Sequence, residues 1–299
     1  MTNKTPSCKI IIMKCNLCPR KCNIERDFNI GFCGANNNIY IAKYMLHMWE
    51  EPIICSNKGS GAIFFSGCNL KCVYCQNHEI SNNKVGKMYS VHELAKLFKT
   101  LEDMGAININ LVTPTHYQNQ IIEALKIYKP KVPVVWNSSG YESDEEISKL
   151  KNYIDIYLVD LKYMNTDISK KYSGAENYPD VCTKAILQMK KNQPQDIIVD
   201  GIMQKGVIIR HLVLPNNIEN TFSCLNWIHN NLGTNQYVSV MAQYTPCHKA
   251  NKYTEINRTL HNIEYKRVTN YLQKLNFNNG YVQSLDSASA EFIPDFNIE

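Results

Sequence analysis

The chain has 299 residues, of which 44 % are apolar, and carries a formal net charge of +5 with a pI near 8.5. This length suffices for one large α/β domain with a small additional segment. The charge is too small for a dedicated nucleic-acid-binding module, and no apolar run approaches the ~18 residues of a membrane span. Because Met1–Lys14 lacks the apolar region of a signal peptide, we expect a cytoplasmic protein without membrane association, whose cysteines remain reduced.

Seven of the 12 cysteines fall in two tight groups, and the first of these groups lies near the N-terminus. The first group consists of Cys15, Cys18, Cys22 and Cys33. Four thiolates can close a tetrahedral zinc site or hold an auxiliary iron–sulfur cluster, and the spacing leaves both metals open. The alternative interpretation is that these four cysteines are unrelated and bind no common metal. We predict a cysteine-rich N-terminal extension over residues 1–56.

A short strand and a loop separate this extension from the rest of the chain. Residues Ile39–Lys43 alternate as a strand does, and we expect a hairpin that closes the extension. The Ser56–Gly61 segment is a loop by composition. The main domain is therefore predicted over residues 57–299.

The second cysteine group follows the apolar segment Gly61–Phe65, which is predicted to be a strand. Cys68, Cys72 and Cys75 have the spacing C-x3-C-x2-C. Thiolates are soft ligands that suit iron–sulfur clusters or zinc, and three of them leave one coordination position free. The spacing therefore predicts a reactive metal centre with an open position.

Beyond this loop, apolar strand-like segments alternate with segments of helical spacing. We expect strands at Gly61–Phe65, Ile107–Val112, Val132–Trp136, Ile156–Asp160, Val207–Leu214 and Tyr237–Met241, and helices at Ser90–Met104, Tyr117–Tyr128, Ser143–Asn152, Tyr178–Lys191, Glu219–Asn230 and Leu260–Leu275. Capping boxes are predicted at Ser90 with Glu93 and at Ser143 with Glu146. The alternation indicates a parallel sheet wound by crossover helices, but periodicity does not separate an open sheet from a barrel.

Polar residues gather where the predicted strands end, which is where parallel α/β folds bind ligands. Besides the three cysteines, these residues are Thr113–Tyr117, Asn137–Tyr141, Asp160–Lys162, Arg210 and Gln243–Tyr244. Singly, each has another interpretation, such as an ion pair for Asp160 and Lys162, or turn chemistry for Ser138 and Ser139. Together they predict a ligand-binding rim.

The motif Cys68-x3-Cys72-x2-Cys75, with aromatic Tyr74, resembles the signature of the radical S-adenosylmethionine (radical SAM) superfamily. Within it, the chain is similar to the glycyl-radical-enzyme activases of the pyruvate formate-lyase activating enzyme type. The segments that carry this similarity are Gly67–Asn77, Leu111–Tyr117, Asn137–Tyr141, Asp155–Tyr163 and Arg210–Pro215. The resemblance implies a partial (β/α)6 TIM-type barrel with a C-terminal cap.

The resemblance also implies roles for individual residues. Cys68, Cys72 and Cys75 would hold a 4Fe–4S cluster whose fourth iron is chelated by SAM. Residues expected to contact SAM are Tyr74, at the adenine, with Asn137, Ser138, Asp160, Lys162 and Arg210. The chain departs from the activases after the second strand, where their Gly-Gly-Glu is replaced and the hydroxyls of Thr113 and Thr115 would accept from the SAM amino group.

Three functions follow from these residues. The first is reductive cleavage of SAM to a 5′-deoxyadenosyl radical that activates a partner protein by glycyl radical formation, with a donor such as flavodoxin or ferredoxin. The second is radical SAM modification of a peptide, RNA or small molecule. The third is a zinc-ribbon module that binds nucleic acid through Cys15–Cys33, which ranks last because Arg20, Lys21 and Arg26 alone supply basic charge there.

Overall fold

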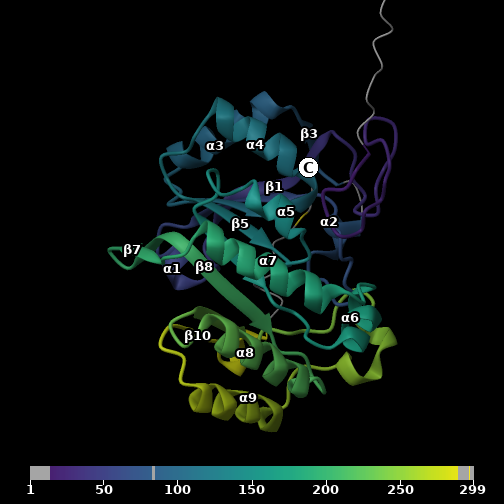
Figure 1. Cartoon of the computed structure of the whole chain (residues 1–299), viewed down its shortest axis with the longest axis vertical. Coiled ribbons are helices and arrows are strands. Elements are labelled where there is room, and N and C mark those ends of the chain that lie inside the picture. The colour runs from purple at the N-terminus through teal and green to yellow at the C-terminus, as the bar shows by residue number, and fades with distance from the viewer. Residues whose placement is uncertain (1–13, 83–84, 289–295, 297–299) are drawn as a thin grey trace, which may run out of the picture.

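One sheet organises the computed structural model, which describes residues 14–82, 85–288 and 296. Its strands are β1 (Ile39–His47), β2 (Ser60–Phe65), β3 (Lys87–Tyr89), β4 (Ile109–Val112), β5 (Val134–Ser138), β6 (Ile156–Asp160), β7 (Ile197–Val199), β8 (Ile202–Leu212), β9 (Tyr237–Met241) and β10 (Gly280–Val282). Figure 1 shows the sheet crossing the molecule beneath its helices.

The parallel part of the sheet has the winding of a barrel. Strands β2, β4, β5, β6, β8 and β9 lie side by side in chain order, and every neighbouring pair is parallel. A doubly wound sheet would instead reverse its order at a switch point. Strand β10 extends the row beside β9, so the sheet stays open and the predicted partial barrel is confirmed.

The helices are α1 (Pro52–Cys55), α2 (His78–Asn82), α3 (Val91–Asp103), α4 (Gln118–Ile127), α5 (Asp144–Ser148), α6 (Thr166–Ser173), α7 (Tyr178–Asn192), α8 (Ile218–Leu232) and α9 (Asn262–Leu275). Of these, α3, α4, α7 and α8 cover the outer face of the sheet. The capping box of α3 is confirmed: Glu93 N donates to Ser90 Oγ, and Ser90 N donates to Glu93 Oε2. The one predicted for α5 is wrong, because Glu146 binds Gln118 and Lys149 instead of the Ser143 backbone.

Strand β1 does not close a separate hairpin in the extension. It pairs antiparallel with β2 and β3, at one end of the main sheet. The chain then turns back through α1, and Ile53 and Ile54 pack against Ile156 and Leu158 of β6. The residues between them in β6, such as Tyr157, pack toward the outer helices, so α1 fills the concave face of the barrel.

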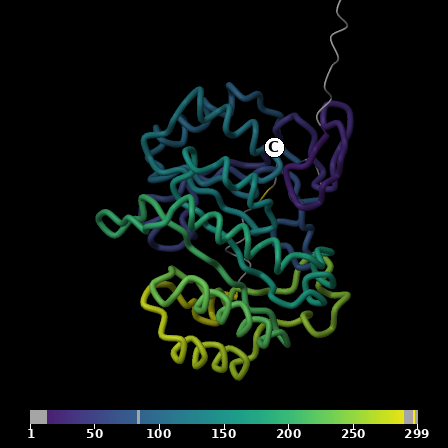
Figure 2. Tube along the Cα trace, viewed as in Figure 1, coloured from purple at the N-terminus to yellow at the C-terminus, as the bar shows by residue number. Residues whose placement is uncertain are grey.

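Within the predicted N-terminal extension, residues 14–38 contain neither helix nor strand, and β1 and α1 follow them. Figure 2 shows residues 14–38, in purple, as a looped segment against one side of the barrel. Buried Arg26 anchors it by donating to His116 O at 2.5 Å and Asn36 O at 2.6 Å. Residues 1–13 of the predicted extension lie outside the described residues, and the division at residue 56 stays a prediction.

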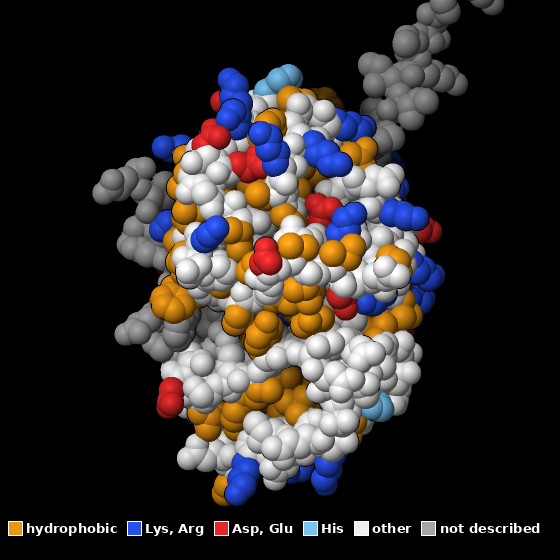
Figure 3. All heavy atoms as spheres, turned by 90° about the vertical axis from the view of Figure 1, so that its left-hand side faces the viewer, with side chains coloured by type: hydrophobic (Ala, Val, Ile, Leu, Met, Phe, Trp, Pro, Cys, Tyr) orange, Lys and Arg blue, Asp and Glu red, His pale blue; other side chains and the backbone are white. Residues whose placement is uncertain are grey.

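The β7–β8 hairpin projects from the sheet on the left of Figure 1. Ile197, Ile198 and Val199 of β7 are exposed. Figure 3 views the molecule from this side, where hydrophobic side chains gather between charged ones. Among the helices of the described residues, none combines the length and the apolar character that crossing a membrane requires.

Candidate functional site

A cavity of about 610 Å³ lies between α1, the strand ends and the three-cysteine loop. It brings together most of the residues predicted for the site. These are Cys68, Cys72, Tyr74, Cys75, Thr113, Asn137, Ser138, Asp160, Lys162 and Arg210. The residues come from one loop and the ends of several parallel strands, as the chain-order sheet requires.

The three-cysteine loop directs its sulfurs toward hydrogen-bond donors. The contacts are Leu70 N to Cys68 Sγ at 3.4 Å, Ser173 Oγ to Cys72 Sγ at 2.9 Å and Ser81 Oγ to Cys75 Sγ at 3.6 Å. Burial raises the pKa of the Cys75 thiol to about 12 and also raises the pKa of Cys72. A buried thiolate therefore needs a cation beside it, and a soft donor set of three cysteines fits an iron–sulfur cluster.

The loop is attached to the N-terminal extension. Cys68 N donates to Cys33 O at 3.0 Å. Gly67 has φ +92°, and a Cβ there would lie 2.5 Å from Cys33 O, so this close approach requires glycine. Arg20 adds a second attachment, because its guanidinium donates to Asn69 O at 2.8 Å and to Gly174 O at 2.6 Å.

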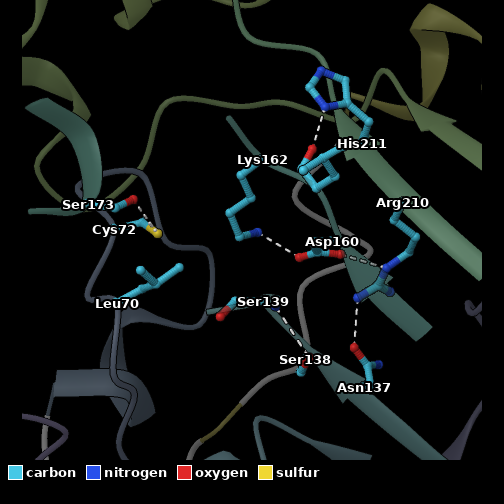
Figure 4. A network of polar contacts seen from close by, with 12 residues as sticks. Leu70, Cys72, Asn137, Ser138, Ser139, Asp160, Lys162, Ser173, Arg210 and His211 are labelled. Atoms are coloured by element: carbon cyan, nitrogen blue, oxygen red, sulfur yellow. Dashed lines mark hydrogen bonds and ion pairs between the residues drawn. The ribbon is translucent and has the colours of Figure 1, made fainter. Parts of the chain in front are cut away.

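A buried ion network lies across the cavity from the cysteines (Figure 4). Asp160 Oδ2 accepts from Lys162 Nζ at 2.6 Å, and its Oδ1 accepts from Arg210 Nε at 2.8 Å. Arg210 Nη2 also donates to Asn137 Oδ1 at 2.7 Å. Burial opposes ionisation of Asp160, but the two cations outweigh it and hold the pKa of this carboxyl below its usual value.

Glu50 joins this network from the segment between β1 and α1. Its Oε2 lies 3.3 Å from Arg210 Nη1, and its Oε1 accepts from Asn110 Nδ2 at 2.8 Å and Asn137 Nδ2 at 3.2 Å. Burial raises the pKa of Glu50, against the opposing effect of Arg210. We did not predict Glu50, because it lies in the segment assigned to the extension. Its one signal is the pair Glu50–Glu51 within an otherwise apolar segment.

The two threonines that follow β4 have different surroundings. Thr113 lines the cavity with φ +59°, a left-handed backbone conformation. Thr115 is 3 % exposed, and its hydroxyl donates to Glu142 Oε1 at 2.8 Å instead of lining the cavity. Glu142, which the sequence did not indicate, also accepts from Trp136 Nε1 and Ser138 Oγ. Ser138 thus lines the cavity with its hydroxyl already engaged.

The N-terminal cysteines also lie close to one another. The sulfurs of Cys22 and Cys33 lie 3.7 and 3.5 Å from the point where a Cβ on Gly31 would sit. Burial raises the pKa of Cys18 to about 11, and the neighbouring Cys33 and Cys22 thiols add to that shift. Within residues 14–82, 85–288 and 296, no three His, Cys, Asp or Glu side chains are arranged to hold a single metal ion.

Comparisons with known proteins agree with this arrangement. The family model of the Radical SAM superfamily matches residues 62–209. An uncharacterized protein of Methanocaldococcus jannaschii is 34 % identical over 283 residues, which cover 91 % of this chain and 78 % of the relative. The pyruvate formate-lyase-activating enzyme of Clostridium pasteurianum is 28 % identical over 193 residues, covering 61 % of this chain and 80 % of that enzyme.

A solved structure supports the fold. Streptococcus suis SuiB bound to S-adenosylmethionine superposes with a TM-score of 0.50 at 17 % identity, covering 74 % of this chain and 49 % of SuiB. The chain thus spans about half the length of that protein. At this identity the likeness concerns the fold alone.

Proposed function

Because this chain belongs to the radical SAM superfamily, we propose that it binds a 4Fe–4S cluster through Cys68, Cys72 and Cys75 and cleaves SAM reductively. When bound, these cofactors supply an electron and a 5′-deoxyadenosyl radical that abstracts hydrogen from a substrate. Three cysteine sulfurs with hydrogen-bond donors, in one cavity with the buried Asp160 network, are the observation on which this proposal rests.

The ion network is proposed to bind the polar end of SAM. Lys162 and Arg210 offer charged hydrogen-bond donors to a carboxylate, and Asp160 holds both in place through bonds of 2.6 and 2.8 Å. Thr113 offers its hydroxyl to the amino group from the end of β4. Tyr74, within the three-cysteine loop, is 6 % exposed, lines the cavity and helps to exclude water.

The test is SAM cleavage by anaerobically reconstituted protein under a strong reductant. The native protein is expected to release 5′-deoxyadenosine, and Cys72→Ala is expected to lose this activity. Cys224→Ala is the matched control, because this buried cysteine belongs to α8 and does not line the cavity. An unchanged rate in Cys72→Ala would refute the assignment.

The substrate is proposed to be a partner protein, activated by glycyl radical formation. The similarity to an enzyme named for activating pyruvate formate-lyase supports this choice. A protein deuterated at its glycine Cα atoms should transfer deuterium into 5′-deoxyadenosine. Transfer from peptides, RNA or small molecules of a cell extract, and none from glycyl-radical proteins, would favour the alternative.

The four N-terminal cysteines are proposed to hold a second metal, either zinc or an auxiliary iron–sulfur cluster. The hydrogen bond from Cys68 N to Cys33 O joins this group directly to the three-cysteine loop. Iron and sulfide in excess of one cluster would make the second site an electron relay to which a flavodoxin or ferredoxin could deliver electrons. Zinc would make it structural. Metal and sulfide analysis of the full chain, with Cys18→Ser as the comparison, separates these outcomes.

A further inference from the structure

Three buried hydroxyl groups form a continuous chain that ends on the sulfur of Cys72. Tyr74 Oη lies 2.5 Å from Tyr163 Oη, and Tyr163 Oη lies 2.9 Å from Ser173 Oγ. Ser173 Oγ then donates to Cys72 Sγ at 2.9 Å, as Figure 4 shows. All four residues are buried, with exposures of 6, 0, 3 and 8 % from Tyr74 to Cys72. None of the roles predicted for Cys72 or Tyr74 explains this series of hydrogen bonds.

When Cys72 is a thiolate, all of these hydrogen bonds are donated toward it, because a thiolate only accepts hydrogen bonds. Ser173 has a single hydroxyl hydrogen, which it gives to Cys72, so its oxygen accepts from Tyr163. Tyr163 in turn accepts from Tyr74. Each donated hydrogen polarises the next hydroxyl, and such cooperative chains strengthen the terminal bond.

Hydrogen bonds to cluster sulfurs change a cluster's reduction potential, because they stabilise the more negative reduced state. The Cys72 donor lies at 2.9 Å, compared with 3.4 Å for Cys68 and 3.6 Å for Cys75. We propose that Ser173, supported by Tyr163 and Tyr74, tunes the reduction potential of the cluster through Cys72. This inference rests on the proposed function, since it requires a cluster on Cys72.

The test is a redox titration of the cluster in reconstituted full-length protein, followed by electron paramagnetic resonance without SAM. Ser173→Ala is expected to reduce the ratio of reduced to oxidised cluster about tenfold at a fixed potential, or ~59 mV for one electron. Tyr163→Phe keeps the bond to sulfur but removes its support, so a smaller shift in the same direction is expected. Ser81→Ala, which loses a bond of 3.6 Å, should also shift less than Ser173→Ala.

Ser169→Ala is the matched control, because this buried serine of α6 donates to Thr166 O and should leave the potential unchanged. Electron–nuclear double resonance in H2O and D2O supplies a second readout. An exchangeable proton coupled to the cluster should vanish in Ser173→Ala and persist in Tyr163→Phe.

Three outcomes separate this inference from the proposed function. Equal potentials in native protein, Ser173→Ala and Tyr163→Phe would overturn the inference and leave the cluster assignment standing. Absence of any cluster from the native protein would overturn the proposed function instead. If only the Ser173→Ala variant fails to hold a cluster, the potential of Tyr163→Phe tests the inference, because this variant keeps the bond from Ser173 to Cys72.

Discussion

Among single residues, Glu50 decides the charge balance of the cavity. Arg210 faces two carboxylates, Asp160 at 2.8 Å and Glu50 at 3.3 Å, and all three side chains are at most 15 % exposed. Charges this deep are stable only when each has a partner. The β1–α1 segment therefore does more than close the concave face, since it delivers the second counter-charge of Arg210.

Replacing Glu50 with Gln should destabilise the fold by about 2 kcal/mol, below the ~3–5 kcal/mol of a buried charge left fully unpaired. Asp160 still compensates Arg210, and the new amide can still bond Asn110. Urea unfolding under identical conditions measures the difference. Glu219→Gln is the control: its pair with Arg267 is 54–77 % exposed and is worth less than ~1 kcal/mol. Equal effects of both substitutions would contradict this account.

At the scale of elements, the start of α9 depends on one glutamate. Glu264 accepts from Arg258 through both carboxylate oxygens, at 2.7 and 2.9 Å. It also accepts from His261 N at 2.9 Å and Asn216 N at 2.7 Å, so it joins the helix start to the loop after β8. The hydrogen bonds from Arg258 lower the pKa of Glu264 to about 2.

This shift predicts a pH dependence of stability. Above pH ~4.5 Glu264 is ionised in both states, whereas between pH ~4.5 and ~2 the unfolded chain binds a proton that the folded chain does not. The folded state therefore loses on the order of 2 kcal/mol as the pH falls through this window. Glu264→Gln should remove that part of the acid loss, measured by urea unfolding at pH 6 and pH 3. The exposed Glu145→Gln of α5 serves as the control.

The sequence was sufficient to predict the strands and helices, but it was insufficient to predict several side-chain contacts. The six parallel strands were predictable because each contains an apolar run, and β2, β4 and β5 are buried along their whole length. The residues lining the cavity at strand ends followed from that arrangement. Glu50 and Glu142 could not be predicted, since their positions depend on how distant segments pack. The failed capping box of α5 has the same cause, because Gln118 of α4 competes for Glu146.

At the scale of the whole molecule, the N-terminal extension and the three-cysteine loop form one unit. Arg20 joins three separate segments, because it donates to Asn69 O in the loop and to Ser173 O and Gly174 O at the end of α6. The planar guanidinium suits this task, since it presents several donors in a fixed geometry.

Arg20→Ala should loosen the loop that carries the three cysteines. Each lost hydrogen bond is worth ~0.5–1.5 kcal/mol, so amide exchange in residues 67–75 should accelerate roughly tenfold. Hydrogen–deuterium exchange with mass spectrometry measures this rate. Lys21→Ala is the control, because Lys21 is the next residue in the sequence and its side chain is exposed. Unchanged exchange in Arg20→Ala would show that the extension does not stabilise the loop.

The Arg20 contacts also fix an order of assembly during synthesis. The residue is made early, yet its partner Gly174 lies 154 positions further along the chain. Contacts of such long sequence separation form late, because the closure of a long loop precedes them. The attachment of the extension to the end of α6 therefore forms only after the ribosome has completed more than half of the protein. Before that moment, the bonds from Cys68 N to Cys33 O and from Arg20 to Asn69 O can already join the extension to the three-cysteine loop.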